Sequence, residues 1–179
     1  QHQFYASGYT PARALPDDEV VAGFKDGTIP MFISGPYMTR SLADQAPELD
    51  GQWAIARIPA KASSTSLMAG SNIGIFAQSD NVAAAGAFLA FLAEAETQLR
   101  WNSLSNDLPA VADAMEELAA SDPMAAVFFE QMQDAKPVPI ISTWGQVSQE
   151  VLAANEQINV GGASVDEAVA SLQQRVAGL

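Results

Sequence analysis

Apolar residues recur every three to four positions through much of the chain, which is the spacing of an amphipathic helix. This spacing predicts helices over residues 17–25, 36–46, 80–92, 111–119, 123–132, 143–158 and 165–176, with a shorter helix around Leu99 and Trp101. The last of these helices has the clearest start signal, because Ser164 and Glu167 stand three positions apart as a capping box. The second half of the chain is therefore expected to be helical.

Three shorter apolar runs, at residues 28–33, 52–58 and 73–76, favour extended structure. The first run leads into the sequence Ser-Gly-Pro-Tyr at residues 34–37, which predicts a tight turn from a strand into a helix. Pro36 suits the first helical position because proline lacks the backbone N–H that a helix leaves unbonded there. Tyr37 is thus expected at the mouth of a strand.

The charge of the chain restricts its partners. Asp and Glu total 21 against 8 Lys and Arg, which gives a formal net charge of -13. A surface this acidic repels the phosphates of nucleic acids and of anionic lipids, so we expect no nucleic acid partner. No apolar stretch reaches the length of about 20 residues that a membrane-spanning helix needs.

The residue types needed for most catalysis are scarce. The chain has no cysteine and a single histidine, His2, which leaves no thiol nucleophile, no cysteine zinc site and no Ser-His-Asp arrangement within it. The segment at residues 70–74 has two glycines, Gly70 and Gly74, but it lacks the Lys-Ser/Thr end of a phosphate-binding loop. Paired carboxylates such as Glu116 and Glu117 fit exposed helix faces. We therefore expect a protein that is not an enzyme, with no cofactor and no metal site.

Aromatic residues are the remaining candidates for a binding site. Tyr37 follows the Gly-Pro turn, and Trp144 opens a helix after an extended segment. Ligand sites gather at such ends of elements, where an aromatic ring can stack on the apolar face of a sugar. On these grounds alone each ring fits a packed core better than a sugar-binding platform. Trp53 and Trp101 are interpreted as packing residues because of their apolar neighbours.

Several short sequence segments follow one another in an order that, taken as a whole, matches a known pattern. They are FKDG at residues 24–27, MFISGPY at 31–37, IP at 58–59, GSNIGI at 70–75, LPA at 108–110, VP at 138–139 and GGASVDEA at 161–168. In this order they resemble the maltose-binding-protein-like family of extracellular solute-binding proteins, and the resemblance covers nearly the whole chain. It implies the C-terminal part of the substrate-binding protein of a sugar ABC transporter, with part of the α/β fold of type II periplasmic-binding-protein-like proteins.

The family's architecture implies two lobes joined by a hinge that close on the ligand. Residues 1–58 would belong to the C-terminal lobe, residues 59–108 to the N-terminal lobe together with a hinge crossing, and residues 109–179 to helices of the C-terminal lobe. The opening strands of the N-terminal lobe are absent from this sequence. The remaining N-terminal part of the same protein is therefore an expected partner.

The resemblance also implies ligand-binding positions. Tyr37 matches an aromatic residue that stacks on the sugar, and Trp144 matches a second one at a helix start. Gly70, Ser71 and Asn72 match a loop whose backbone and side chains reach ligand hydroxyls. Four residues after Trp144, where some relatives have an Arg that reaches the ligand, this chain has a serine, which speaks against a sugar contact from that turn.

The implied function is capture of a mono- or oligosaccharide by lobe closure and its delivery to the transmembrane subunits of an ABC permease. The implied location is periplasmic or extracytoplasmic, with a membrane-anchored lipoprotein as one form. An alternative is a non-catalytic protein-interaction module in which the aromatic residues are core. A glycoside-processing enzyme ranks third, because no carboxylate pair lies in a recognisable motif.

Overall fold

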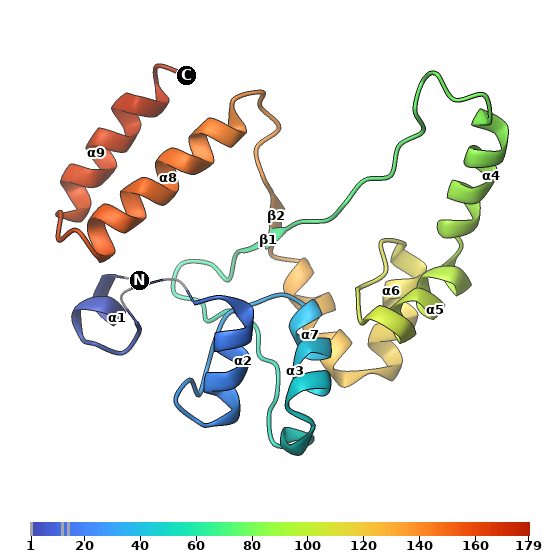
Figure 1. Ribbon diagram of the computed structural model, residues 1–179, viewed down its shortest axis with the longest axis horizontal. Coiled ribbons are helices and arrows are strands. Elements are labelled where there is room, and N and C mark those ends of the chain that lie inside the picture. Colours follow the sequence, from blue (N-terminus) through green and yellow to red (C-terminus); the bar gives the residue numbers. More distant parts are fainter. Residues whose placement is uncertain (1, 12, 14) are drawn as a thin grey trace. The chain divides into compact units, whose positions relative to one another are not determined.

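The computed structural model describes residues 2–11, 13 and 15–179 (Figure 1). In chain order its elements are α1 His2–Ala6, α2 Asp17–Lys25, α3 Tyr37–Gln45, the 3-10 turn η1 Pro47–Leu49, β1 Ser66–Met68, α4 Val82–Leu92, α5 Ala95–Ser105, α6 Ala112–Ser121, α7 Pro123–Met132, β2 Ala135–Pro137, α8 Trp144–Asn159 and α9 Val165–Val176. Helices therefore dominate the described chain.

The predicted helices are confirmed, with ends that shift by one or two residues. Local signals in the sequence account for several ends. Three acidic residues lie in the first turn of α2 and Lys25 in its last turn, where each complements the helix dipole. Asp122 caps α7 by accepting hydrogen bonds from the backbone N–H groups of Met124 and Ala125, and Pro123 takes the first helical position.

The predicted strands at 28–33, 52–58 and 73–76 are wrong, because all three segments are irregular. The strands of the described residues are β1 and β2, which pair in parallel with Ser66 opposite Ala135 and Met68 opposite Pro137. A strand exists only where a second strand supplies the hydrogen-bonding partners, and these can lie far away in the sequence. The three apolar runs have no such partner here.

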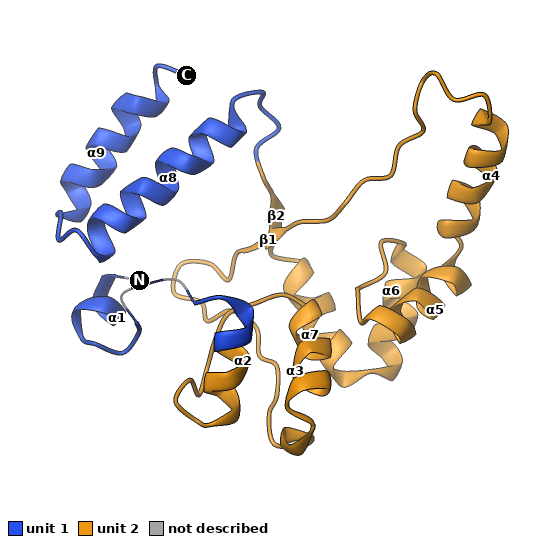
Figure 2. Cartoon of the chain, in the orientation of Figure 1, with its two compact units in different colours: residues 1–19, 139–179 blue, residues 20–138 orange. Residues whose placement is uncertain are grey.

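The chain divides into two compact units, coloured separately in Figure 2. Unit 1 comprises residues 1–19 and 139–179, and unit 2 comprises residues 20–138. In unit 1, α8 and α9 pack against each other, and α1 also contacts α8. Gly162, with a φ of 73°, turns the chain between α8 and α9 in a backbone conformation that favours glycine.

Unit 1 is held by polar contacts as well as by packing. Arg175 of α9 forms an ion pair with Glu150 of α8. At the start of α9, the Glu167 backbone N–H donates to the Ser164 hydroxyl oxygen at 3.3 Å, as the predicted capping box requires. The Glu167 carboxylate accepts a hydrogen bond from the Ser164 hydroxyl at 2.7 Å. In a complete capping box that carboxylate bonds the backbone N–H of Ser164 instead, so the box is realised in part.

The core of unit 2 holds α2 and α3 together. Val21 of α2 is buried against Met38 and Leu42 of α3. Phe24, Phe32 and Trp53 pack around this cluster. The rings of Phe24 and Phe32 meet edge to face, with centroids 5.2 Å apart, which is a favoured geometry for aromatic pairs. The packing role predicted for Trp53 is thus confirmed.

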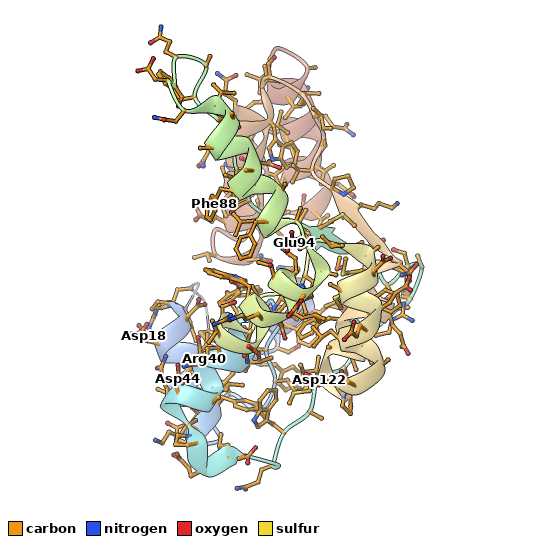
Figure 3. The ribbon with its side chains drawn as sticks, turned by 90° about the vertical axis from the view of Figure 1, so that its right-hand side faces the viewer. Asp18, Arg40, Asp44, Phe88, Glu94 and Asp122 are labelled. Atoms are coloured by element: carbon orange, nitrogen blue, oxygen red, sulfur yellow. The ribbon has the colours of Figure 1, made fainter. Side chains whose placement is uncertain are left out.

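Helix α4 carries no polar side chain on any face, yet none of its residues is buried. The side chains of Phe88 and Phe91 are 57% and 51% exposed, and Figure 3 marks Phe88 on this helix. A helix that is apolar all round is normally found inside a protein. The packing role predicted for Trp101 on the neighbouring α5 is not met within the described residues, because Trp101 is 57% exposed.

No single helix among those described is long and apolar enough to cross a membrane. Taken together, α4 and α5 have the length and apolar composition of a spanning segment, but they are bent by 72° at their junction.

Candidate functional site

Tyr37 is the first residue of α3, and the turn before it fixes its position. The backbone N–H of Met38 donates to the carbonyl of Gly35 at 3.1 Å, so the helix begins directly at the Gly-Pro turn. A side chain on Gly35 would come within 3.2 Å of the Tyr37 ring, so glycine leaves the space that the ring uses. Met38 is buried in the core of unit 2, whereas Tyr37 is 47% exposed. The ring is therefore accessible for stacking.

The Tyr37 hydroxyl is also held in place. The Ser34 hydroxyl donates a hydrogen bond to the phenol oxygen of Tyr37 at 3.1 Å, across the Gly-Pro turn. This contact uses a lone pair of the phenol oxygen and leaves its O–H free to rotate toward another acceptor. Tyr37 thus offers a ring face and a polar tip together.

The predicted loop of small residues follows β1 without forming regular structure. Gly70, Ser71 and Asn72 are exposed. A side chain added at Gly70 would meet nothing within 4 Å. The backbone amides of this loop can therefore be approached, as a site for ligand hydroxyls requires.

Trp144 is the first residue of α8 and is half-buried. Its backbone N–H donates to the carbonyl of Ile141 at 3.2 Å, which closes the turn that precedes the helix. The Ser148 hydroxyl, one turn further along, donates to the carbonyl of Gly145 at 2.9 Å. That hydroxyl thus donates within its own helix, and the expectation that this turn makes no sugar contact stays a prediction.

The five predicted residues are divided between the two units. Tyr37 and the loop residues 70–72 lie in unit 2, and Trp144 lies in unit 1. Neither aromatic residue is buried. The expectation that both rings stack on the sugar, and the assignment of residues 1–58, 59–108 and 109–179 to lobes, stay predictions.

Unit 2 contains a cavity of about 440 Å³ between α3, α5 and α7. Its lining includes Pro36, Trp53, Asn106 and Phe128, and it includes none of the five predicted ligand residues. Asn106 ends α5 in a left-handed conformation with a φ of 61°, and its side-chain amide donates to the Thr39 hydroxyl oxygen at 3.1 Å. The sequence pattern did not predict this cavity. The only related sequence feature was an asparagine, a residue type that can end a helix in the left-handed conformation.

Two carboxyl groups in unit 2 have perturbed pKa values. The Thr28 hydroxyl, at 2.6 Å, and the Thr28 backbone N–H, at 2.9 Å, donate to Asp26 and hold the pKa of its carboxyl below the usual range. The Lys25 ammonium lies 2.6 Å from the Glu48 carboxylate and lowers the pKa of Glu48. Both carboxyl groups are exposed and bonded to neighbours, so they stabilise local structure.

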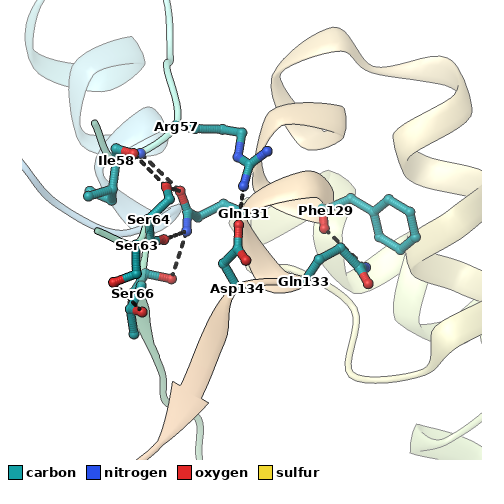
Figure 4. Close-up of polar contacts among 10 residues, drawn as sticks. Arg57, Ile58, Ser63, Ser64, Ser66, Phe129, Gln131, Gln133 and Asp134 are labelled. Atoms are coloured by element: carbon teal, nitrogen blue, oxygen red, sulfur yellow. Dashed lines mark hydrogen bonds and ion pairs between the residues drawn. The ribbon is translucent and has the colours of Figure 1, made fainter. Parts of the chain in front are cut away.

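Some of the other charged side chains form ion pairs. Arg40 and Asp44 pair one turn apart on α3, as Figure 3 shows. Arg57 pairs with Asp134 (Figure 4). Residues 2–11, 13 and 15–179 contain no group of three or more histidine or carboxylate side chains that could hold a metal ion.

Solved structures that share this fold include the two that follow. The first, the sugar-binding protein MalE from the phytopathogen Xanthomonas citri, is 27% identical with a TM-score of 0.84, and the match covers 98% of this chain and 45% of that one. The second, a cyclic alpha-maltosyl-1,6-maltose binding protein from Arthrobacter globiformis, is 22% identical with a TM-score of 0.65 over 88% of this chain and 45% of that one. The chain therefore spans less than half the length of these proteins.

These matches confirm the predicted fold class, a partial type II periplasmic-binding-protein-like fold. Comparison with curated protein sequences gives no match. A sequence profile described as "Bacterial extracellular solute-binding protein" matches residues 2–130, which is more than half of the chain. The predicted family is thereby confirmed, and the chain belongs to the bacterial extracellular solute-binding protein family.

Proposed function

We propose that this chain is the later part of the substrate-binding component of an ABC sugar importer. It would help to capture a mono- or oligosaccharide by lobe closure and to present it to the transmembrane permease subunits. The observation that carries the proposal is the match to the sugar-binding protein MalE over 98% of this chain at a TM-score of 0.84. Membership of an extracellular family supports an extracytoplasmic location, with a lipoprotein anchor as one form.

The proposed ligand contacts begin with Tyr37. Its half-exposed ring is placed by the Gly-Pro turn, and its phenol oxygen is bonded to Ser34. Such a ring can stack on the apolar face of a sugar while its O–H bonds a sugar hydroxyl. Trp144 is proposed as the second stacking residue.

The open loop of Gly70, Ser71 and Asn72 completes the proposed site in this chain. Backbone amides and a small hydroxyl or amide side chain suit sugar hydroxyls, which both donate and accept hydrogen bonds. The N-terminal part of the same protein is proposed to supply the facing groups. The role is binding and release, without chemical change of the sugar.

Calorimetric titration of the complete protein with maltose and maltotriose tests this function. Tyr37→Ala and Trp144→Ala are each expected to weaken binding by about 1 to 3 kcal/mol, because each removes aromatic area that the sugar covers. Tyr9→Ala and Trp101→Ala are matched controls, since Tyr9 is 81% and Trp101 is 57% exposed outside the proposed site. Unchanged affinity in both site variants would refute the assignment. Release of a cleaved sugar would favour an enzyme instead.

The protein-interaction alternative predicts a different result. In that case Tyr37 and Trp144 are core residues, so their replacement would lower stability and leave sugar binding absent throughout. The 47% exposure of Tyr37 favours the sugar-binding function over this alternative.

A further inference from the structure

Two Asp-Gly peptide bonds occur in the chain, Asp26–Gly27 and Asp50–Gly51. An aspartate before a glycine is prone to rearrange, because glycine has no side chain to hinder attack of its backbone nitrogen on the neighbouring carboxyl group. Both pairs are exposed, and the glycine of each pair has a positive φ. Any difference in their reactivity therefore comes from their contacts.

The contacts of the first pair hold both reacting groups. The Asp26 carboxylate accepts hydrogen bonds from the Thr28 hydroxyl at 2.6 Å and from the Thr28 backbone N–H at 2.9 Å. The Gly27 backbone N–H donates to the Phe24 carbonyl at 3.3 Å. The bonds from Thr28 also lower the pKa of Asp26, which keeps its carboxyl group in the charged and less electrophilic form.

The second pair lacks both restraints. Within the part of the chain that the structure describes, the Asp50 carboxyl makes no hydrogen bond or ion pair, and the Gly51 backbone N–H has no hydrogen-bond partner. Asp50 has a φ of -54° and a ψ of 131°, and Gly51 has a φ of 69°. The Gln52 backbone N–H donates to the Leu49 carbonyl at 2.9 Å. Residues 49–52 thus form a type II turn, with glycine where a positive φ is required.

We propose that Asp50 is a site of spontaneous succinimide formation and isomerisation to isoaspartate, and that the fold protects Asp26 from the same reaction. The Gly51 backbone nitrogen bonds to Cγ of Asp50 and loses its proton while a hydroxyl group leaves Cγ, so one water is released and a five-membered imide forms. Water then adds to an imide carbonyl. Attack at the former backbone carbonyl breaks its bond to nitrogen, and the main chain afterwards runs through the Asp50 side chain. The reaction needs no oxidant, and it is independent of the proposed sugar-binding function.

The turn has to open before the ring can close. The imide ring holds the Gly51 nitrogen and the Asp50 Cβ nearly eclipsed about the Cα–C bond of Asp50, and a ψ of 131° does not. The backbone bond from Gln52 to Leu49 closes the turn, and the Gln52 side-chain amide adds a bond to the Glu48 carbonyl at 2.7 Å. Exposed turns with so few bonds open locally at a low cost in free energy.

Isomerisation at this turn affects the core of unit 2. Trp53 follows directly after the turn and packs against the buried cluster between α2 and α3. Isoaspartate adds one carbon to the main chain, so the type II turn that leads into Trp53 is lost. We therefore expect the isomerised protein to be less stable than the original one.

The test ages the complete protein at neutral pH and follows both aspartates in one sample. Cleavage after glutamate separates them, because Asp26 falls in the peptide of residues 20–48 and Asp50 in that of residues 49–94. Mass spectrometry with electron-transfer fragmentation locates isoaspartate in each peptide by the fragment ions that its extra main-chain carbon produces. A second sample, aged in concentrated urea, reports the reaction in the absence of the fold.

We expect isoaspartate to accumulate severalfold faster at Asp50 than at Asp26 in the folded protein, and at similar rates at both positions in urea. Asp50→Glu should leave that position unmodified, because a glutamate would have to close a six-membered ring, which is slow. Gln52→Ala removes the side-chain bond across the turn and should speed the reaction at Asp50 alone. Thr28→Val removes the hydroxyl that bonds Asp26 and should speed the reaction at Asp26 alone.

Equal rates at Asp50 and Asp26 in the folded protein would overturn the proposal, and so would a faster reaction at Asp26. A ratio of rates that is the same in urea would also overturn it, because the sequence rather than the fold would then set the ratio. Thermal unfolding checks the consequence for the core. The melting temperature should fall on ageing in the wild type and stay constant in Asp50→Glu, and an equal fall in both would refute the assigned effect on Trp53.

Discussion

The Ser34 hydroxyl and the Tyr37 phenol oxygen are 3.1 Å apart and joined by a hydrogen bond across the Gly-Pro turn. We expect Ser34→Ala to weaken sugar binding by less than Tyr37→Ala, by about 0.5 to 1.5 kcal/mol, because it frees the ring without removing the stacking surface. Calorimetric titration of both variants tests whether Tyr37→Ala causes the larger loss of affinity. Ser63→Ala, which changes another exposed hydroxyl, is expected to have no effect. A larger loss in Ser34→Ala than in Tyr37→Ala would contradict the proposed stacking.

The start of α9 should contribute measurably to stability. Ser164→Ala removes the oxygen that accepts from the Glu167 backbone N–H, so the free energy of unfolding should fall by about 1 kcal/mol. Ser121→Ala is the control, because its hydroxyl bonds carbonyls near the end of α6, and it should change stability little. Urea denaturation followed by circular dichroism compares the two. An equal change in the free energy of unfolding in both variants would mean that the Ser164 cap does not stabilise the fold.

The Asp26 carboxyl should respond to pH in a defined direction. Because its bonds to Thr28 lower its folded pKa, this carboxyl stabilises the fold above its unfolded pKa, and that contribution is lost as pH falls through the folded value. Thr28→Val removes the hydroxyl, which is the larger cause, so the pKa of Asp26 should rise. Carbon-13 NMR titration of the side-chain carboxyls measures it. The pKa of Glu48, lowered by Lys25, should stay where it is and serves as the internal reference.

The apolar surface of α4 should make the isolated 179-residue chain associate. Phe88 and Phe91 stack at 6.4 Å between centroids and are both more than half exposed. Contiguous apolar patches of this kind seek a partner. Phe88→Asp is expected to reduce self-association in sedimentation velocity, whereas Ile140→Asp, at a side chain 98% exposed outside the helix, should reduce it much less. A clean wild-type monomer at high concentration would refute this expectation.

Local signals made the helices predictable. Ser164 with Glu167, and Asp122 with Pro123, announce helix starts because capping depends on residues within one turn of each other. The apolar run at residues 28–33 predicted a strand, and that prediction is wrong. A strand needs a second strand elsewhere in the chain as its hydrogen-bonding partner, and a local sequence pattern does not indicate whether that partner exists.

The candidate site was predictable to different degrees at different positions. The Gly-Pro turn predicted Tyr37 at a helix start, and its partial exposure agrees with a ligand role without testing it. Outside that site, the Gln131 side-chain amide bonds the Ile58 N–H and the Ser64 carbonyl (Figure 4), and the sequence carried no signal for these contacts because a glutamine on a helix is usually solvated. Contacts between a side chain and distant backbone are the part of a structure that sequence patterns leave out.

The parallel pairing of β1 with β2 also has a consequence for the order of folding. Ser66 and Ala135 are separated in the sequence by the whole of α4, α5, α6 and α7. Closing so long a loop before any contact rewards it is slow, whereas each helix forms from neighbours within microseconds. We therefore expect the helices of unit 2 to form early, and the two short strands to meet last and separate first when the protein is unfolded.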